Sequence, residues 1–159
     1  MHDYPTLAIV GRPNVGKSSL FNVICKKKIS IVEEEEGITR DTICHLTEFD
    51  DIPFYVMDTG GIAKEGVFLE QIRSQALEAI AKADVIALVI DGKVGLTTQD
   101  QEVAKLLLQK KKPTILVINK MDRVSDEAMG YRCLNCGIQE FVFTSVSYTH
   151  LRAHETSLH

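Results

Sequence analysis

The segment Val85–Asp91 (VIALVID) restricts the fold more than any other part of the chain. Six of its seven residues are apolar, so a strand built from it has no polar face. Strands of this kind occur inside parallel sheets whose two faces are both covered by helices. The rest of the chain must therefore supply further parallel strands, together with helices for both faces.

Short apolar runs and amphipathic segments alternate along the chain. Strands are also predicted at Leu7–Val10, Thr42–Phe49, Pro53–Asp58, Thr114–Ile118 and Phe141–Thr144. Helices are predicted at Lys17–Cys25, at Phe68–Lys82, from a cap at Thr97 or Thr98 to Leu108, and at Ser125–Cys133. The second helix has apolar residues at helical spacing: Leu69, Ile72, Ala76, Ala79, Ile80 and Ala83. Residues Ile29–Asp41 are polar and aperiodic, and they are predicted to form a mobile loop.

This alternation predicts one three-layer α/β domain over residues 1–147. Its sheet is expected to have six mostly parallel strands flanked by helices, with an antiparallel edge hairpin that turns at Asp50–Asp51. In sheets of this class ligands bind beyond the carboxyl ends of the strands. Polar residues that directly follow a strand are therefore the first candidates for a site.

Composition excludes several classes of partner. The 159 residues carry a net charge of −4, which leaves no bulk basic surface for wrapping nucleic acid but does not exclude a local basic patch. No apolar run approaches the roughly 18 to 20 residues that span a bilayer, and the N-terminus lacks the pattern of a secretory signal. The four cysteines are too few for a disulfide scaffold. We expect a cytoplasmic protein with no membrane or DNA partner.

Residues Gly11–Ser18 (GRPNVGKS) match the phosphate-binding pattern G-x-x-x-x-G-K-S/T, and they lie between a predicted strand and a predicted helix. The glycines allow a tight turn whose backbone N–H groups converge on phosphate oxygens. The N-terminus of the following helix adds the positive end of the helix dipole. Lys17 brings a compact charge to the outer phosphates, and the Ser18 hydroxyl can bind Mg²⁺. The segment therefore predicts a site for a nucleoside triphosphate.

Two further segments lie where they can respond to the γ-phosphate and the metal. Asp58–Gly61 (DTGG) ends a strand, so its carboxylate can hold a water of the Mg²⁺ shell, while the N–H of Gly61 can approach the γ-phosphate. Gly37–Asp41 (GITRD) lies in the predicted mobile loop. The hydroxyl of Thr39 can complete the Mg²⁺ shell when the γ-phosphate is present, which would order this loop.

Asn119–Asp122 (NKMD) follows the strand Thr114–Ile118 directly. The Asp122 carboxylate can accept hydrogen bonds from the N1–H and the exocyclic amine of guanine, and adenine has neither donor on that edge. Asn119 can bond the base and tie down the phosphate loop, and the aliphatic stem of Lys120 can lie over the ring. The motif therefore predicts preference for guanine.

In this order, the motifs GRPNVGKS, GITRD, DTGG and NKMD resemble those of the translation-factor-related P-loop GTPases. The likeness is greatest to the first G domain of the EngA/Der family, tandem GTPases of bacterial ribosome assembly, and it covers about residues 4–147. A helix carrying Gln71, Arg73 and Gln75 and the string DGKVGLTTQDQE add to it. Other assembly GTPases and tRNA-modifying GTPases of the MnmE type share the PNVGKS and TRD strings, so they remain alternatives.

The resemblance implies Mg²⁺-dependent hydrolysis of GTP to GDP and phosphate, in a switch that acts in large-subunit assembly. Ile62 stands where many small GTPases keep a water-orienting glutamine, so slow turnover is implied, and relatives with an asparagine at the position of Asn14 use K⁺. The implied Mg²⁺ ligands are Ser18, Thr39 and Asp58, and the implied catalytic residues are Lys17, Asn14, Thr39 and Gly61. The implied GTP-binding residues are Gly11, Arg12, Pro13, Asn14, Val15, Gly16, Lys17, Ser18, Ser19, Asp58, Thr59, Gly60, Gly61, Ile62, Asn119, Lys120, Met121, Asp122, Ser145 and Val146.

The end of the sequence departs from the family pattern. Val146 replaces the usual alanine, so it would crowd the guanine O6 contact although its N–H remains. Residues 148–159 are expected to form an atypical tail or a cloning remnant in which the closing helix is lost or replaced. The second G domain and the RNA-binding domain of EngA/Der proteins are missing too, so contact with a ribosomal particle or rRNA is expected through a longer protein. The alternative function is a nucleotide-controlled binding module with negligible hydrolysis on its own.

Two remaining features receive no functional role. Cys133 and Cys136 form a lone C-x-x-C pair, and zinc takes four ligands, while Cys25 and Cys44 lie far away in the sequence. His45 is expected on the solvent side of the edge hairpin.

Overall fold

The computed structural model describes residues 4–25, 30–32, 43–59, 68–123 and 126–145. Its strands are β1 (Thr6–Gly11), β2 (Ser30–Val32), β3 (Ile43–Phe49), β4 (Ile52–Asp58), β5 (Val85–Asp91), β6 (Thr114–Asn119) and β7 (Phe141–Phe143). Its helices are α1 (Lys17–Ile24), α2 (Phe68–Lys82), α3 (Thr98–Gln109), α4 (Glu127–Arg132) and the 3-10 helix η4 (Cys133–Cys136). The atypical tail that was expected at residues 148–159 lies outside the residues that the structure describes.

The strands form one sheet in the order β2-β3-β4-β1-β5-β6-β7. Strands β4, β1, β5, β6 and β7 run parallel, whereas β2, β3 and β4 pair antiparallel at one edge. The expected mostly parallel α/β sheet with an antiparallel edge hairpin is therefore confirmed. The described part adds β2, a three-residue edge strand, to the six strands that were expected.

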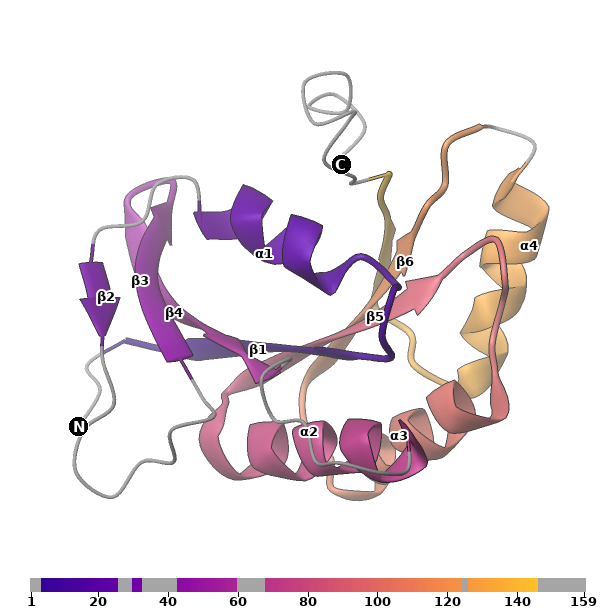
Figure 1. Cartoon of the computed structure of the whole chain (residues 1–159), viewed down its shortest axis with the longest axis horizontal. Coiled ribbons are helices and arrows are strands. Elements are labelled where there is room, and N and C mark those ends of the chain that lie inside the picture. The colour runs from indigo at the N-terminus through magenta and orange to yellow at the C-terminus, as the bar shows by residue number, and fades with distance from the viewer. Residues whose placement is uncertain (1–3, 26–29, 33–42, 60–67, 124–125, 146–159) are drawn as a thin grey trace.

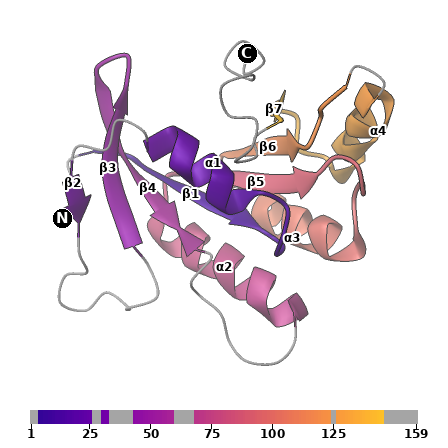
Figure 2. The same ribbon diagram turned by 45° about the horizontal axis from the view of Figure 1, so that its top comes forward.

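Helices cover both faces of the sheet, as the apolar strand β5 requires. Helix α1 lies on one face, and α2 and α3 lie on the other (Figure 1). The alternate residues Ile86, Leu88 and Ile90 pack in the cluster that α2 and α3 cover, whereas Ala87 and Val89 pack in the cluster that α1 covers. All five are at most 4% exposed. The three-layer arrangement is also visible after a turn of the molecule (Figure 2).

The start of α3 explains why that helix begins where it does. The Thr97 side chain accepts a hydrogen bond from the Asp100 backbone N–H at 3.1 Å, and the Asp100 carboxylate accepts one from the Thr97 N–H at 3.0 Å. This reciprocal capping box satisfies two backbone donors that the helix itself leaves unpaired. It also buries a carboxylate, since Asp100 is 0% exposed.

Three local expectations differ from the structure. Ser30–Val32 forms a strand that pairs with β3, although it lies in the segment predicted to be a loop. The partner strand determines this pairing, and the local sequence pattern does not show it. The helix expected to begin at Ser125 covers Glu127–Arg132 and continues as η4. The prediction that His45 faces solvent is wrong, since its ring lies 4.9 Å from that of Phe21 on α1.

None of the helices in the described ranges has both the length and the apolar character that a membrane span requires.

Candidate functional site

The carboxyl ends of the parallel strands meet at one edge of the sheet. Strand β1 ends at Gly11, β4 at Asp58 and β6 at Asn119, and these strands run in the same direction. The three polar motifs are thus brought together, and hydrogen bonds across this edge join residues up to 106 positions apart in the sequence. This edge is where ligands bind in sheets of this class.

The loop between β1 and α1 has the backbone shape that its glycines predict. Gly16 precedes α1 with φ 103°, in the left-handed region that favours glycine. A Cβ at Gly11 would lie 2.9 Å from the Val89 backbone oxygen, so only glycine fits beside β5 there. Asn14 also has a positive φ, 70°. The loop therefore turns tightly and leads into the N-terminus of an eight-residue helix.

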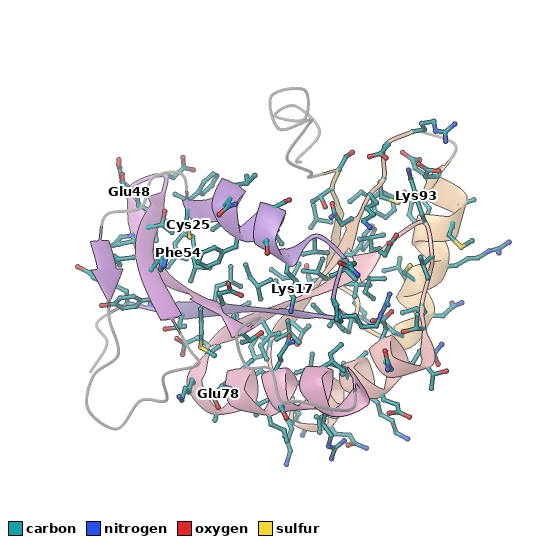
Figure 3. The ribbon with its side chains drawn as sticks, viewed as in Figure 1. Lys17, Cys25, Glu48, Phe54, Glu78 and Lys93 are labelled. Atoms are coloured by element: carbon teal, nitrogen blue, oxygen red, sulfur yellow. The ribbon has the colours of Figure 1, made fainter. Side chains whose placement is uncertain are left out.

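Lys17, the first residue of α1, lies between α1 and α2 (Figure 3). Its ammonium group donates a hydrogen bond to Gln75 Oε1 at 3.0 Å. Burial lowers the pKa of Lys17 from its ordinary value, and the nearby Asp58 carboxylate opposes this shift. The cation is therefore partly removed from water, which strengthens its attraction for an anion.

The residues expected at a metal supply hydroxyl and carboxylate oxygens. Ser18 is exposed in the first turn of α1, and Asp58 is half-buried at the end of β4. Mg²⁺ is bound through one or two protein oxygens together with phosphate oxygens and waters, so this donor set fits Mg²⁺. In the described ranges no group of three His, Cys, Asp or Glu side chains could hold a metal ion by itself.

Asn119 connects the base motif to the phosphate loop. Its Nδ2 donates a hydrogen bond to the Val15 backbone oxygen at 2.9 Å, and its Oδ1 accepts one from the Thr144 hydroxyl at 2.8 Å. Asn119 is 1% exposed. The segment after β7 also binds the base motif. The Thr144 backbone oxygen accepts a hydrogen bond from the Met121 N–H, and the Ser145 hydroxyl donates one to Asp122 Oδ1.

Lys120 makes a second connection between the same two motifs. Its ammonium group donates to the Asn14 backbone oxygen at 2.8 Å and lies 3.0 Å from Asp91 Oδ2. Asp91 ends β5 and also accepts from the Lys93 N–H at 2.9 Å. The Lys120 stem therefore runs between the two loops, anchored at its charged end.

The guanine-reading candidate Asp122 has a cation beside it. Lys93 Nζ donates to Asp122 Oδ2 at 2.8 Å, and Figure 3 shows Lys93 on the α4 side of the molecule. The hydrogen bond and the charge of Asp122 raise the pKa of Lys93. Both side chains are more than two-fifths exposed, so water weakens this pair.

Arg12 lies in the expected binding set, but its side chain points to another partner. Its Nε lies 3.2 Å from Asp100 Oδ1 of the α3 capping box. Asp100 is fully buried and the Arg12 side chain is 18% exposed. The guanidinium therefore binds the start of α3 in this structure, and only the Arg12 backbone remains in the phosphate loop.

Several expected residues lie outside the described part: Thr39, Gly60, Gly61, Ile62 and Val146. Conversely, the structure brings residues to the site that were not assigned to it. Gln75 contacts Lys17, and Asp91 and Lys93 contact the base motif. Asp91 had a usable signal in the sequence, because it is the polar residue that ends the apolar strand β5. Gln75 lies inside a helix and carries no comparable signal.

Comparison with known proteins agrees with this geometry. A family model described as a 50S ribosome-binding GTPase matches residues 6–120. GTPase Der of Protochlamydia amoebophila is 50% identical over 150 residues, which cover 92% of this chain and 31% of that protein. GTPase Der of Clostridium perfringens is 48% identical over 145 residues, which cover 90% of this chain and 33% of that protein. The chain spans about a third of the length of these curated relatives.

Solved structures share the fold. A variant of Aquifex aeolicus Era bound to GDP and AlF4⁻ is 26% identical with a TM-score of 0.67, covering 96% of this chain and 56% of that one. Era in complex with MgGDPNP and a fragment of 16S ribosomal RNA is 27% identical with a TM-score of 0.68 and the same coverage. The expected resemblance to EngA/Der-type GTPases is thus confirmed by the curated relatives. Because the family model spans well over half of the residues, including the whole phosphate loop and the first two residues of the base motif, the chain belongs to the family of 50S ribosome-binding GTPases.

Proposed function

We propose that this chain binds GTP with Mg²⁺ and hydrolyses it to GDP and phosphate, as a conformational switch in assembly of the large ribosomal subunit. The observation that carries the proposal is the double link between the two recognition motifs. Asn119 holds the Val15 oxygen and Lys120 holds the Asn14 oxygen, at 2.9 Å and 2.8 Å. These two hydrogen bonds hold the NKMD segment, which carries Asp122, against the phosphate loop. A single nucleotide can therefore place its phosphates at the loop and its base at Asp122.

Recognition of guanine falls to Asp122. Its Oδ1 accepts from Ser145 and its Oδ2 accepts from Lys93, so both carboxylate oxygens act as hydrogen-bond acceptors, the role that the guanine edge requires of them. The N1–H and exocyclic amine of guanine are two donors side by side, whereas adenine would leave the carboxylate without them. The N–H of Val146 is assigned to guanine O6, and the stem of Lys120 to one face of the ring.

The phosphates are assigned to backbone N–H groups within Asn14–Ser19 and to the Lys17 ammonium. Ser18 and Asp58, together with Thr39, would hold Mg²⁺, of which Ser18 supplies a hydroxyl in the first turn of α1. The bound ion would neutralise charge on the outer phosphates, which lowers the barrier for phosphoryl transfer. Thr39 and the N–H of Gly61 are assigned to the γ-phosphate, so that its loss releases their segments.

Orientation of the attacking water needs a device other than a glutamine, because Ile62 has no hydrogen-bonding side chain. We assign K⁺ beside Asn14 as the other catalytic device, which compensates for the missing glutamine by neutralising charge on the transferring phosphoryl group. The Asn14 side chain is exposed at the edge of the loop, so its amide oxygen is accessible to a cation. A cation there stabilises the negative charge that develops in the transition state.

The ribosomal role and a cytoplasmic location rest on the relatives. The matching family is described as 50S ribosome-binding, and a structural neighbour, Era, has been solved with ribosomal RNA. The curated relatives are about three times as long as this chain, so contact with a ribosomal particle or rRNA is proposed for the longer protein.

The decisive experiment compares phosphate release from GTP in KCl and in NaCl, with ATP as the control nucleotide and fluorescent GTP to measure affinity. K⁺-stimulated turnover of GTP and rejection of ATP would support the proposed GTP hydrolysis, the guanine preference and the K⁺ site. Tight GTP binding without turnover in either salt would support the nucleotide-controlled binding module instead. Absence of GTP binding, or equal binding of ATP, would overturn the proposal.

A further inference from the structure

The amide oxygen of Gln75 lies at the centre of the phosphate-binding region, although Gln75 belongs to α2. Gln75 Oε1 accepts from the Lys17 ammonium at 3.0 Å and from the Gly11 backbone N–H at 3.3 Å. The Thr59 hydroxyl oxygen lies 3.1 Å from it. Gln75 is 4% exposed, so these contacts are made out of water, where a polar group without partners is costly.

Part of this arrangement is structural. Strand β4 pairs with β1 only as far as Ile9, which lies opposite Asp58. Beyond that point the β4 side of β1 is completed by side chains, because the Thr59 hydroxyl donates to the Ile9 oxygen at 2.6 Å and Gln75 accepts from the Gly11 N–H. Gln75 therefore closes the end of a strand pairing, which explains why a polar residue is buried at this position of α2.

The contact with Lys17 goes beyond closing the strand. A lysine ammonium has three donors, so the one that binds Gln75 leaves two for phosphate oxygens. The amide is neutral and does not cancel the positive charge that attracts the phosphates, as a carboxylate in its place would. A long lysine side chain loses much rotamer freedom when it binds, and a buried acceptor that already holds it reduces this loss on binding.

We propose that Gln75 is a positioning residue, which holds the Lys17 ammonium ready for the outer phosphates of the nucleotide. The proposal rests on the proposed function, because it assumes that Lys17 meets phosphates. It adds a residue of α2, 58 positions away in sequence, to the phosphate-binding apparatus. Gln75 is assigned no contact with the nucleotide itself.

The test is a double-mutant cycle between Gln75→Leu and Lys17→Ala, with affinities for GTP and for GMP measured by competition with a fluorescent guanine nucleotide. Leucine has a similar size but no acceptor, so we expect Gln75→Leu to weaken GTP binding about tenfold, the value of one hydrogen bond to a charged group. GMP affinity should stay within about twofold, because GMP lacks the outer phosphates. In the Lys17→Ala background, Gln75→Leu should no longer weaken GTP binding.

Equal loss of GTP and GMP binding in Gln75→Leu, or an equal loss of GTP binding with and without Lys17, would assign Gln75 a structural role only and overturn the proposal. Gln75→Glu guards against a folding defect, since it keeps the acceptor for Gly11. It should weaken GTP binding more than Gln75→Leu does while leaving GMP binding unchanged, and GTP affinity equal to that of the unmutated chain would contradict the proposal. Gln101→Leu, on the exposed side of α3, is the matched control and should change neither affinity.

The outcome for this inference is separable from that of the proposed function. If the unmutated chain binds no GTP, the proposed function fails and the inference fails with it. If the unmutated chain binds GTP and Gln75→Leu binds it equally well, only the inference fails.

Discussion

Asn119 Nδ2 and the backbone oxygen of Val15 are joined by a buried hydrogen bond of 2.9 Å across 104 residues of sequence. The bond holds the end of β6 against the loop that follows β1. Thr144 fixes the other end of the same amide. The geometry of the site thus depends on a side chain whose own position is determined from two directions.

We expect Asn119→Ala to lower the free energy of unfolding by about 2 kcal/mol, because the Val15 oxygen and the Thr144 hydroxyl both lose a buried partner. Urea denaturation monitored by circular dichroism measures the change. Asn135→Ala, at an exposed position of η4, is the matched control and should alter stability by less than about 0.5 kcal/mol. Equal stability of the two variants would show that the bond contributes nothing.

We expect Asp122→Asn to transfer nucleotide preference from GTP to XTP. The amide presents a donor where xanthine has a carbonyl in place of the amine of guanine, so GTP affinity should fall about 100-fold or more. Competition of GTP and XTP against a fluorescent nucleotide measures the exchange. Asp51→Asn is the control, because this exposed turn residue has φ 65°, which asparagine tolerates. Unchanged GTP affinity in Asp122→Asn would contradict the assignment of Asp122 to the base.

The sequence predicts the backbone frame of this site well, for a physical reason. The strands that carry the site end at Gly11, Asp58 and Asn119, and parallel strands of one sheet bring such ends together whatever the helices do. The strand β5 was recognisable because its residues alternate between two apolar faces, both of which are buried.

The side-chain partners were not predictable in the same way. Gln75 reaches Lys17, and Asp100 reaches Arg12, only because α2 and α3 lie on the sheet at a particular rotation and height. The spacing of apolar residues predicts which face of a helix is buried. It does not predict which residue of the sheet or of its loops each helix side chain contacts. The edge strand Ser30–Val32 escaped prediction for a related reason, since three residues carry too little periodicity to identify it.

We expect Arg12→Met to lower the free energy of unfolding by about 2 kcal/mol, because the fully buried Asp100 carboxylate would lose its cation. The loss should shrink in an Asp100→Asn background, where no charge remains to be neutralised. Urea unfolding of the two single variants and the double variant measures this coupling. Arg132→Met, in the exposed last turn of α4, is the matched control. Additive effects of Arg12→Met and Asp100→Asn would contradict a stabilising ion pair.

We expect Cys133 to resist alkylation in the folded chain. Burial, and to a smaller extent the charge of Asp100, raises the pKa of Cys133 from 9.0 to about 11. The reactive thiolate is therefore about 100-fold rarer at pH 8 than for an ordinary thiol. Iodoacetamide labelling followed by peptide mass spectrometry measures the rate, with the same chain in urea as the reference. Equal rates at Cys133 in the folded and the unfolded chain would refute this expectation.

The same thiol should make the fold less stable in alkali. The folded pKa lies above the unfolded value, so the unfolded chain loses its proton first, and the contribution of Cys133 is complete below pH 9 and declines as the pH rises from 9.0 toward about 11. Cys136, whose pKa burial also raises, acts in the same direction. The free energy of unfolding, measured in urea at several pH values, should therefore fall more steeply over this range for the unmutated chain than for Cys133→Ala. Parallel curves for the two chains would mean that the thiol ionises equally in both states.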